Sequence, residues 1–278
     1  MNHPLLALFD RAAVERHRAG ALVVRTFDTA LSVATVLDLM RRQTVPGCFA
    51  VDGYFVKHHR VFSLRDWRCG LHPDRASGLL GGYGEAINTL AANLLGSPSH
   101  KLLAHARNNL SGRAWIVFQK LPEMQSLESF LLASGASPAA TQGLEQVATT
   151  LCDSLRRGLY HGDTNASNVF INPARGEVKL IDHAIFLNLN ATVGVGLALQ
   201  FSKMWDKRIK PVFSYEQFCE IVRAQLLKHG GAAELEKNFA RFTHYSATRN
   251  SRARRLERLL EASGGQPDFS ARLLKHSA

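Results

Sequence analysis

Three oxygen-bearing side chains lie in the middle of the chain, at spacings that suit metal binding and proton transfer. Asp163 follows a His-Gly pair, Asn168 comes five residues later, and Asp182 follows an apolar run. One carboxylate and one amide oxygen suit Mg²⁺, which proteins bind through one or two carboxylates together with phosphate oxygens. The remaining carboxylate could accept the proton of an attacking hydroxyl. The set therefore has the parts that phosphoryl transfer requires.

Two predicted strands position these three side chains. Val169–Ile171 and Val178–Ile181 favour β-structure, and Asn172–Gly176 between them has the composition of a tight turn. Because an antiparallel hairpin brings its two outer ends together, we expect the three side chains to share one small volume. Taken singly, an Asp or Asn in a loop is more often a turn former or a helix cap, and His161 is more often a packed, hydrogen-bonded histidine. The joint pattern favours a site.

The segment from His161-Gly162-Asp163 through Asn168 to Asp182 resembles the catalytic core of the protein-kinase-like superfamily. It is most similar to the bacterial lipopolysaccharide core kinases (Kdo and heptose kinases), and more distantly to aminoglycoside and choline phosphotransferases. The resemblance implies Asp163 as catalytic base, Asn168 and Asp182 as magnesium ligands, and ATP and Mg²⁺ as cofactors. Where a protein kinase has Asp-Phe-Gly, this chain has Asp182-His183-Ala184, which argues against an ordinary protein kinase without excluding one.

A lysine and a glutamate upstream complete this resemblance. Lys57 lies in a predicted strand, Tyr54–His58, which forms a hairpin with the strand before it around Asp52–Gly53. Glu85 opens a predicted helix over 85–95, whose apolar residues recur at helical spacing. Lys57 could be a solvated lysine on an exposed strand, and Glu85 could simply complement the helix dipole. The resemblance implies instead an ion pair in which Glu85 orients Lys57 on the nucleotide phosphates.

A strand break predicts the boundary between two domains. Ala114–Phe118 reads as a buried strand, and Gln119-Lys120-Leu121-Pro122 ends it. This resembles a kinase hinge, whose backbone at Gln119 and Leu121 would hydrogen-bond the adenine ring. We therefore expect an N-lobe in residues 1–120 and a C-lobe in residues 121–278. The resemblance implies an α+β, bilobal protein-kinase-like fold, with a β-rich N-lobe that holds one key helix and a mainly helical C-lobe.

Some segments give no clear pattern. A glycine-rich phosphate loop, which a protein kinase would show in residues 1–45, is not visible. Gly78–Gly84 lacks the Gly-Lys-Ser/Thr ending of a phosphate loop, so we expect a connector there. Ala191–Leu199 is a run of small residues in the place of an activation segment.

Two further segments carry helix signals. The segment 138–157 has Ser137 as its expected N-cap, and the segment 213–228 has Ser214 and Gln217 as an expected capping box.

The chain is strongly basic, with a net charge of +11 over 278 residues. Such an excess indicates an anionic partner, such as nucleic acid, an acidic membrane surface or a phosphorylated glycolipid. Part of it lies in the tail, residues 241–278, where Arg252, Arg254, Arg255 and Arg258 occur among leucines at helical spacing. Such a helix could lie on an anionic membrane, or it could dock on its own lobe through the leucines.

Cysteine usage and hydropathy bear on the setting of the protein. The four cysteines have no metal-ligand spacing, which favours a reduced, cytoplasmic location. No run approaches the roughly 18 apolar residues of a membrane span. Peripheral attachment at the inner face of the inner membrane is compatible with both observations.

Four functions follow from these patterns. The leading hypothesis is an ATP-dependent kinase that phosphorylates a sugar hydroxyl of lipopolysaccharide core or a related glycolipid. The alternatives are an aminoglycoside- or choline-type phosphotransferase, a protein kinase, and a non-catalytic pseudokinase or nucleic-acid-binding module. Aminoglycosides are cationic and would suit an acidic enzyme better than this basic one. No basic motif interleaved with aromatic residues is present, so we expect no nucleic-acid partner.

Overall fold

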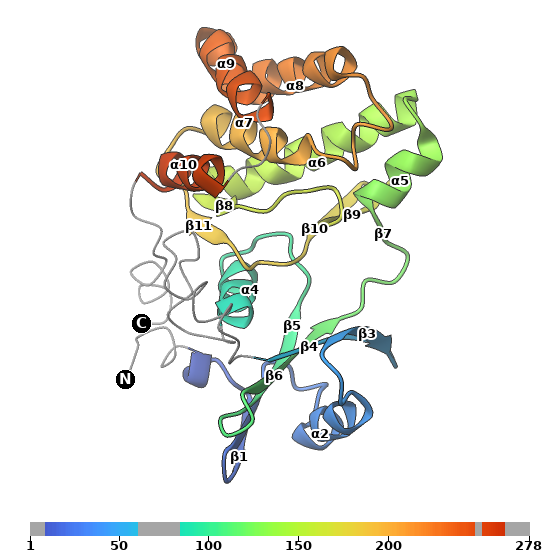
Figure 1. Ribbon diagram of the computed structural model, residues 1–278, viewed down its shortest axis with the longest axis vertical. Helices are drawn as coiled ribbons and strands as arrows, with labels where there is room; N and C mark the ends of the chain where they lie inside the picture. The colour runs from blue at the N-terminus through green and yellow to red at the C-terminus, as the bar shows by residue number, and fades with distance from the viewer. Residues whose placement is uncertain (1–8, 61–83, 248–251, 265–278) are drawn as a thin grey trace. The chain divides into compact units, whose positions relative to one another are not determined.

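The structure, a computed structural model, describes residues 9–60, 84–247 and 252–264 (Figure 1). These residues form two compact units. Unit 1 contains residues 9–60, 84–94 and 100–122, and unit 2 contains residues 95–99, 123–247 and 252–264. Residues 95–99 belong to unit 2, so the chain enters that unit briefly before the main change after Pro122. The assignment of an N-lobe and a C-lobe that meet at residue 120 stays a prediction.

Unit 1 is built on an antiparallel sheet, in which the described strands follow the order β1-β2-β5-β6-β4-β3. The strands are β1 (Glu15–Ala19), β2 (Leu22–Thr26), β3 (Gly47–Val51), β4 (Tyr54–Arg60), β5 (Leu102–Asn108) and β6 (Arg113–Gln119). β3 and β4 pair around the Asp52–Gly53 turn, so the predicted hairpin is confirmed. Lys57 lies in β4, whose other neighbour is β6.

Helices α2 (Val33–Arg42) and α4 (Gly84–Leu94) accompany the sheet of unit 1 (Figure 1). α2 buries its apolar face in a cluster that includes Val56 of β4 and Val117 of β6. Because successive side chains of a strand point to opposite faces, Lys57 points away from this cluster. It meets α4, which lies within one residue of the predicted helix bounds.

Unit 2 is mainly helical in its described part (Figure 1). Its α-helices are α5 (Leu127–Ser134), α6 (Pro138–Arg156), α7 (Val193–Met204), α8 (Tyr215–Gly230), α9 (Leu235–Ser246) and α10 (Arg252–Ser263). Its strands are β7 (Gln125–Ser126), β8 (Leu159–His161), β9 (Val169–Asn172), β10 (Glu177–Leu180) and β11 (Phe186–Asn188). β7 and β10 flank β9, and β8 pairs with β11. The predicted α+β class, with sheet first and helices second, is confirmed.

Local capping explains where two of these helices begin. The Ser137 hydroxyl accepts the Ala140 N–H at 3.3 Å, and Pro138 occupies the first helical position of α6. Ser214 and Gln217 form a reciprocal capping box at the start of α8. Each cap satisfies backbone donors that the first helical turn would otherwise leave unpaired, and both predicted caps are confirmed.

The small-residue run 191–199, which gave no clear pattern in sequence, forms the start of a helix. It leads into α7, whose side chains are buried on all sides rather than on one face. Burial on all sides removes the polar face that gives a surface helix its period, so sequence pattern could not reveal it. A Cβ at Gly196 would lie 2.6 Å from Leu155 Cδ2 of α6, so a glycine allows these two helices to approach closely.

An aromatic cluster forms the core between the later helices of unit 2. Phe201 of α7, Phe218 of α8 and Phe242 of α9 are fully buried. Their ring centroids lie 5.9 Å apart for Phe201 and Phe218, and 6.0 Å apart for Phe218 and Phe242. Among the helices that the structure describes, none combines the length and the apolar character needed to cross a membrane.

Phe218→Ala should lower the free energy of unfolding by about 3–5 kcal/mol, because it leaves a cavity in this aromatic cluster. Urea unfolding followed by circular dichroism measures the loss. The matched control is Leu227→Ala in the same helix, where the side chain is 48% exposed and the loss should stay near 1 kcal/mol or below. Equal losses in the two variants would contradict the placement of Phe218 in the core.

Candidate active site

The predicted hairpin carries the site. β9 and β10 pair in antiparallel fashion, and the loop of residues 162–168 leads from β8 into β9. The ladder extends one step beyond the strands, because the Ile181 N–H donates to the Asn168 carbonyl at 2.9 Å. Asn168 therefore lies opposite Ile181, the residue before Asp182.

A second hydrogen bond connects Asn168 to Asp163. Asn168 Nδ2 donates to the Asp163 backbone carbonyl at 2.9 Å, and the Asn168 N–H donates to the Asn165 carbonyl at 2.9 Å. With Nδ2 turned into the loop, Asn168 Oδ1 keeps its acceptor capacity for another group. The structure thus brings together the segments that carry the three predicted site residues Asp163, Asn168 and Asp182.

His161 joins the two ends of this arrangement. Its side chain is buried, its Nε2 lies 2.9 Å from the Ile181 carbonyl, and its Nδ1 accepts the Asp163 N–H at 3.2 Å. Burial lowers the pKa of His161, which favours the neutral ring. A neutral imidazole has one donor and one acceptor, as these two bonds require. The prediction of a packed, hydrogen-bonded histidine is confirmed.

One oxygen of the Asp163 carboxylate is held by two donors. Lys203 Nζ of α7 lies 3.0 Å from Asp163 Oδ1, and Asn165 Nδ2 donates to the same oxygen at 3.2 Å. Burial on its own would raise the pKa of Asp163, but Lys203, with smaller contributions from His161 and Arg255, lowers it below its usual value. Asp163 is therefore ionised at neutral pH and can accept a proton.

Asp182 has an unusual backbone conformation, with φ at +57°. This left-handed region costs a non-glycine residue free energy, although Asp and Asn tolerate it better than most. His183, the next residue, is fully buried, and its ring centroid lies 4.8 Å from that of His161. The buried histidine anchors the chain directly after Asp182, at a point where the backbone is strained.

The side chains at this end of the hairpin fit a magnesium ion. Asn168 Oδ1 and the Asp182 carboxylate are hard oxygen donors on facing segments. Among the described residues, no group of three or more His, Cys, Asp and Glu could hold a metal ion. A cation that takes part of its ligands from phosphate suits this sparse donor set better than one that needs a full protein cage.

Lys57 and Glu85 meet within unit 1. Lys57 Nζ lies 2.5 Å from Glu85 Oε2, and the two side chains are 27% and 12% exposed. Glu85 stands in the first turn of α4, where a carboxylate also complements the helix dipole. The ion pair that the resemblance implied is therefore present, and a partly buried lysine held in this way presents a fixed positive charge.

Two backbone N–H groups in the segment expected to bind adenine already form hydrogen bonds within unit 1. The Gln119 N–H donates to the Lys101 carbonyl at 2.9 Å, and the Lys120 N–H donates to the Gly53 carbonyl at 3.0 Å. These two donors cannot also bind a base. Recognition of adenine by this segment would have to use backbone carbonyls or Leu121.

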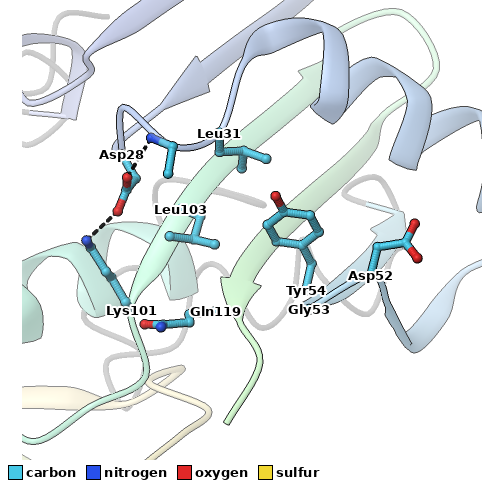
Figure 2. A pocket seen from close by; sticks show the side chains of 9 residues that line it. Asp28, Leu31, Asp52, Gly53, Tyr54, Lys101, Leu103 and Gln119 are labelled. Atoms are coloured by element: carbon cyan, nitrogen blue, oxygen red, sulfur yellow. Dashed lines mark hydrogen bonds and ion pairs between the residues drawn. The ribbon is translucent and has the colours of Figure 1, made fainter. Parts of the chain in front are cut away.

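A pocket of about 310 Å³ lies elsewhere in unit 1 (Figure 2). In it, Lys101 pairs with Asp28, and Gln119 lies nearby. Leu103 and Tyr54, which also line the pocket, belong to the apolar cluster beneath α2. The pocket therefore opens on the sheet face away from Lys57, and the Gln119 side chain does not point toward that lysine.

Two contributions to the site escaped sequence analysis. Lys203 lies in α7, far along the chain from Asp163, and no local pattern marks it. α10 forms part of the wall of the loop of residues 162–168, because a Cβ at Gly162 would lie 2.9 Å from Leu259 Cδ2. Only glycine leaves room for this close approach beside Asp163.

The basic tail helix docks within unit 2 through both apolar and charged side chains. Leu259 is buried, and Glu261 of α10 pairs with Arg241 of α9 at 2.7 Å, so the docked alternative is confirmed. Arg258 is only 4% exposed, and its Nη1 lies 3.4 Å from Ser202 Oγ. The prediction that Arg258 contacts a membrane is wrong, because its guanidinium lies in the protein interior.

Part of the chain matches a known protein family. Residues 85–184 match the model of the lipopolysaccharide kinase (Kdo/WaaP) family. The match to the Kdo/WaaP family begins at the helix that carries Glu85 and extends past Asp182. The resemblance inferred from the sequence is therefore confirmed, and it supports kinase activity at the level of the family.

Among solved structures, the chain is similar to the bifunctional kinase-methyltransferase WbdD, with 17% sequence identity and a TM-score of 0.44. The similarity covers 77% of this chain and 46% of that one, so this chain spans about half the length of WbdD. No curated protein matches the chain.

His161 predicts a specific dependence of stability on pH. Because its pKa is lower in the folded state than the ordinary value of about 6.5, the unfolded chain binds the proton more readily. The stability contributed by the neutral ring is therefore present above about pH 6.5 and is lost as the pH falls below it, by up to about 1.4 kcal/mol per pH unit.

His161→Gln should lower stability at pH 7.5 and flatten this loss. Urea unfolding at pH 7.5, 6.5 and 5.5 measures the slope for parent and variant. His17→Gln, on the exposed strand β1, is the control and should keep the slope of the parent. A His161→Gln variant whose slope equals that of the parent would show that His161 is not held neutral.

Proposed function

We propose that the protein is an ATP- and Mg²⁺-dependent kinase that phosphorylates a sugar hydroxyl of lipopolysaccharide core or a related glycolipid. The main support is the set of hydrogen bonds that joins Asp163, Asn168 and the segment before Asp182 into one site. A base and two metal-binding groups on a single rigid hairpin end match the division of labour in phosphoryl transfer.

The proposed reaction uses Asp163 as the base. The acceptor hydroxyl oxygen forms a bond to the γ-phosphorus of ATP, the bond from that phosphorus to the β–γ bridging oxygen breaks, and ADP leaves. The hydroxyl proton passes to the Asp163 carboxylate, which must lie within about 2.6–3.2 Å of the hydroxyl. With Oδ1 held by Lys203 and Asn165, we propose that Oδ2 receives this proton.

Asn168 and Asp182 would hold Mg²⁺, which when bound neutralises charge on the phosphates. The strained backbone at Asp182 and the hydrogen bond from Asn168 Nδ2 would fix the orientation of these two ligands. We propose that Lys57, oriented by Glu85, binds the α- and β-phosphates of ATP. Preorganised charges of this kind lower the barrier because they need no rearrangement during the reaction.

An anionic glycolipid is the acceptor that best suits the charge of the chain. The net charge of +11 favours a substrate that carries phosphate or carboxylate groups over a cationic aminoglycoside. The Kdo/WaaP family match supports the same class of acceptor. We propose a cytoplasmic protein that meets this substrate at the inner face of the inner membrane.

The proposed base is tested by Asp163→Asn. This variant should lose at least about 100-fold in transfer of labelled γ-phosphate, because an amide cannot accept the proton. The measurement uses a panel of truncated lipopolysaccharides, aminoglycosides and generic protein acceptors. Calorimetric binding of Mg²⁺–ATP should stay within about threefold of the parent, since Asn168 and Asp182 remain.

Asp153→Asn, at an exposed carboxylate of α6, is the matched control and should leave transfer unchanged. Equal turnover by Asp163→Asn and the parent would remove Asp163 from the mechanism. Transfer by the parent to aminoglycosides or proteins, with none to lipopolysaccharide, would replace the proposed acceptor.

The role of Lys57 is tested against a second lysine of unit 1. Lys57→Met should reduce kcat/KM for ATP by at least about tenfold, and Glu85→Gln should act in the same direction because it frees the lysine. Lys101→Met removes a lysine that is also ion-paired, with Asp28, but on the other side of the sheet. Steady-state kinetics in which Lys101→Met loses as much as Lys57→Met would contradict a specific role for Lys57.

A further inference from the structure

Lys203 is a cation beside the proposed base, and neither the sequence motifs nor the family match accounts for it. The family match ends at residue 184, before α7 begins. Yet Lys203 Nζ lies 3.0 Å from Asp163 Oδ1, and its side chain is only 13% exposed. Holding a long, flexible lysine in one place costs up to about 2 kcal/mol of side-chain entropy, so this placement calls for an explanation.

The helix that carries Lys203 is fixed to the catalytic loop one turn earlier. The Gln200 carbonyl accepts the Thr164 hydroxyl at 3.1 Å, and Gln200 Nε2 donates to the His161 carbonyl at 3.4 Å. Gln200 is buried, so these bonds are shielded from water. Because residues three apart share a helix face, Lys203 is directed toward the same loop.

A lysine in the last turn of a helix is often explained by the helix dipole alone. That explanation needs no contact with a carboxylate and leaves the ammonium in solvent. Lys207, which lies three residues beyond the end of α7, is exposed to solvent. Lys203 instead contacts the carboxylate that the proposed reaction uses as its base.

We propose that Lys203 is a catalytic residue of the phosphoryl transfer, which holds Asp163 Oδ1 and donates to the oxygens of the phosphoryl group in transit. The inference rests on the proposed function. The acceptor oxygen must lie within hydrogen-bond distance of Asp163 and must bond to the phosphorus, so the phosphoryl oxygens pass close to this carboxylate. A lysine has three N–H donors, and the bond to Asp163 uses one of them.

The position of Lys203 suits the charge that the transferring group carries. Three equatorial oxygens share negative charge during transfer, and a fixed cation beside them stabilises that charge. A purely structural lysine would only offset the charge of the partly buried Asp163. The two roles differ in one respect: the structural role disappears when Asp163 loses its charge, whereas a contact with the phosphoryl group persists.

The first test measures binding rather than turnover. Calorimetry compares Mg²⁺–ADP with Mg²⁺–ADP–aluminium fluoride, which imitates the transferring phosphoryl group. Lys203→Met should weaken binding of the fluoride complex by at least about tenfold and binding of Mg²⁺–ADP by less than about threefold. Lys203→Arg should keep most of the affinity, and Lys207→Met, which removes the same charge nearby, should match the parent.

The second test is a double-mutant comparison of the rate of γ-phosphate transfer. If Lys203 contacts the phosphoryl group, Lys203→Met should slow the Asp163→Asn variant by a further tenfold or more. The proposal fails if Lys203→Met binds the fluoride complex like the parent, or if it leaves the rate of Asp163→Asn unchanged. Thermal denaturation of each variant shows whether a loss of binding or rate arises from misfolding. If Lys203→Met is misfolded, the affinity of Lys203→Arg for the fluoride complex decides between the two roles.

The two proposals fail in different ways. A parent protein that binds Mg²⁺–ADP and transfers phosphate, while Lys203→Met behaves like Lys207→Met, would overturn the role of Lys203 alone. A parent protein that binds neither Mg²⁺–ADP nor the fluoride complex would overturn the proposed function and the role of Lys203 with it.

Discussion

A single neutral imidazole sets the spacing between Asp163 and the segment that leads to Asp182. His161 bonds to the backbone of Asp163 on one side and to the carbonyl of Ile181 on the other. A protonated ring could not accept the first of these bonds, and a solvated ring would not stay neutral near its ordinary pKa. The burial of His161 therefore maintains the separation of Asp163 and Asp182, on which the geometry of the hairpin end depends.

Much of this arrangement was predictable because the signals are local. The β9–β10 hairpin, the caps of α6 and α8, and the hydrogen bonds that join Asn168 to Asp163 and to Ile181 follow from residues near one another in sequence. Turn chemistry and strand propensity act over a few residues, so they can be read without knowledge of the fold. The Lys57–Glu85 ion pair could be predicted only from the family resemblance, because no local signal connects a strand residue to a helix residue 28 positions later.

The rest depends on contacts between distant segments, which have no local signal. α7 is buried on all sides, so it lacks the polar face by which a helix is recognised in sequence. Lys203 reaches Asp163 because the hydrogen bond between Thr164 and the Gln200 carbonyl holds α7 against the loop, and this contact has no local sequence signal. The charge pattern of the tail helix suits docking on the protein and binding to a membrane surface equally well. The burial of Arg258 and Leu259 shows that the helix docks on the protein.

The contact between Leu259 and Gly162 also affects the order in which the protein matures. The loop of residues 162–168 is synthesised well before α10, which supplies a part of its wall and lies close to the end of the described chain. Contacts between such distant residues form late, because the chain between them must first be ordered. A nascent chain on the ribosome therefore lacks this part of the wall, and we expect the loop to be completed only after α10 has emerged and docked.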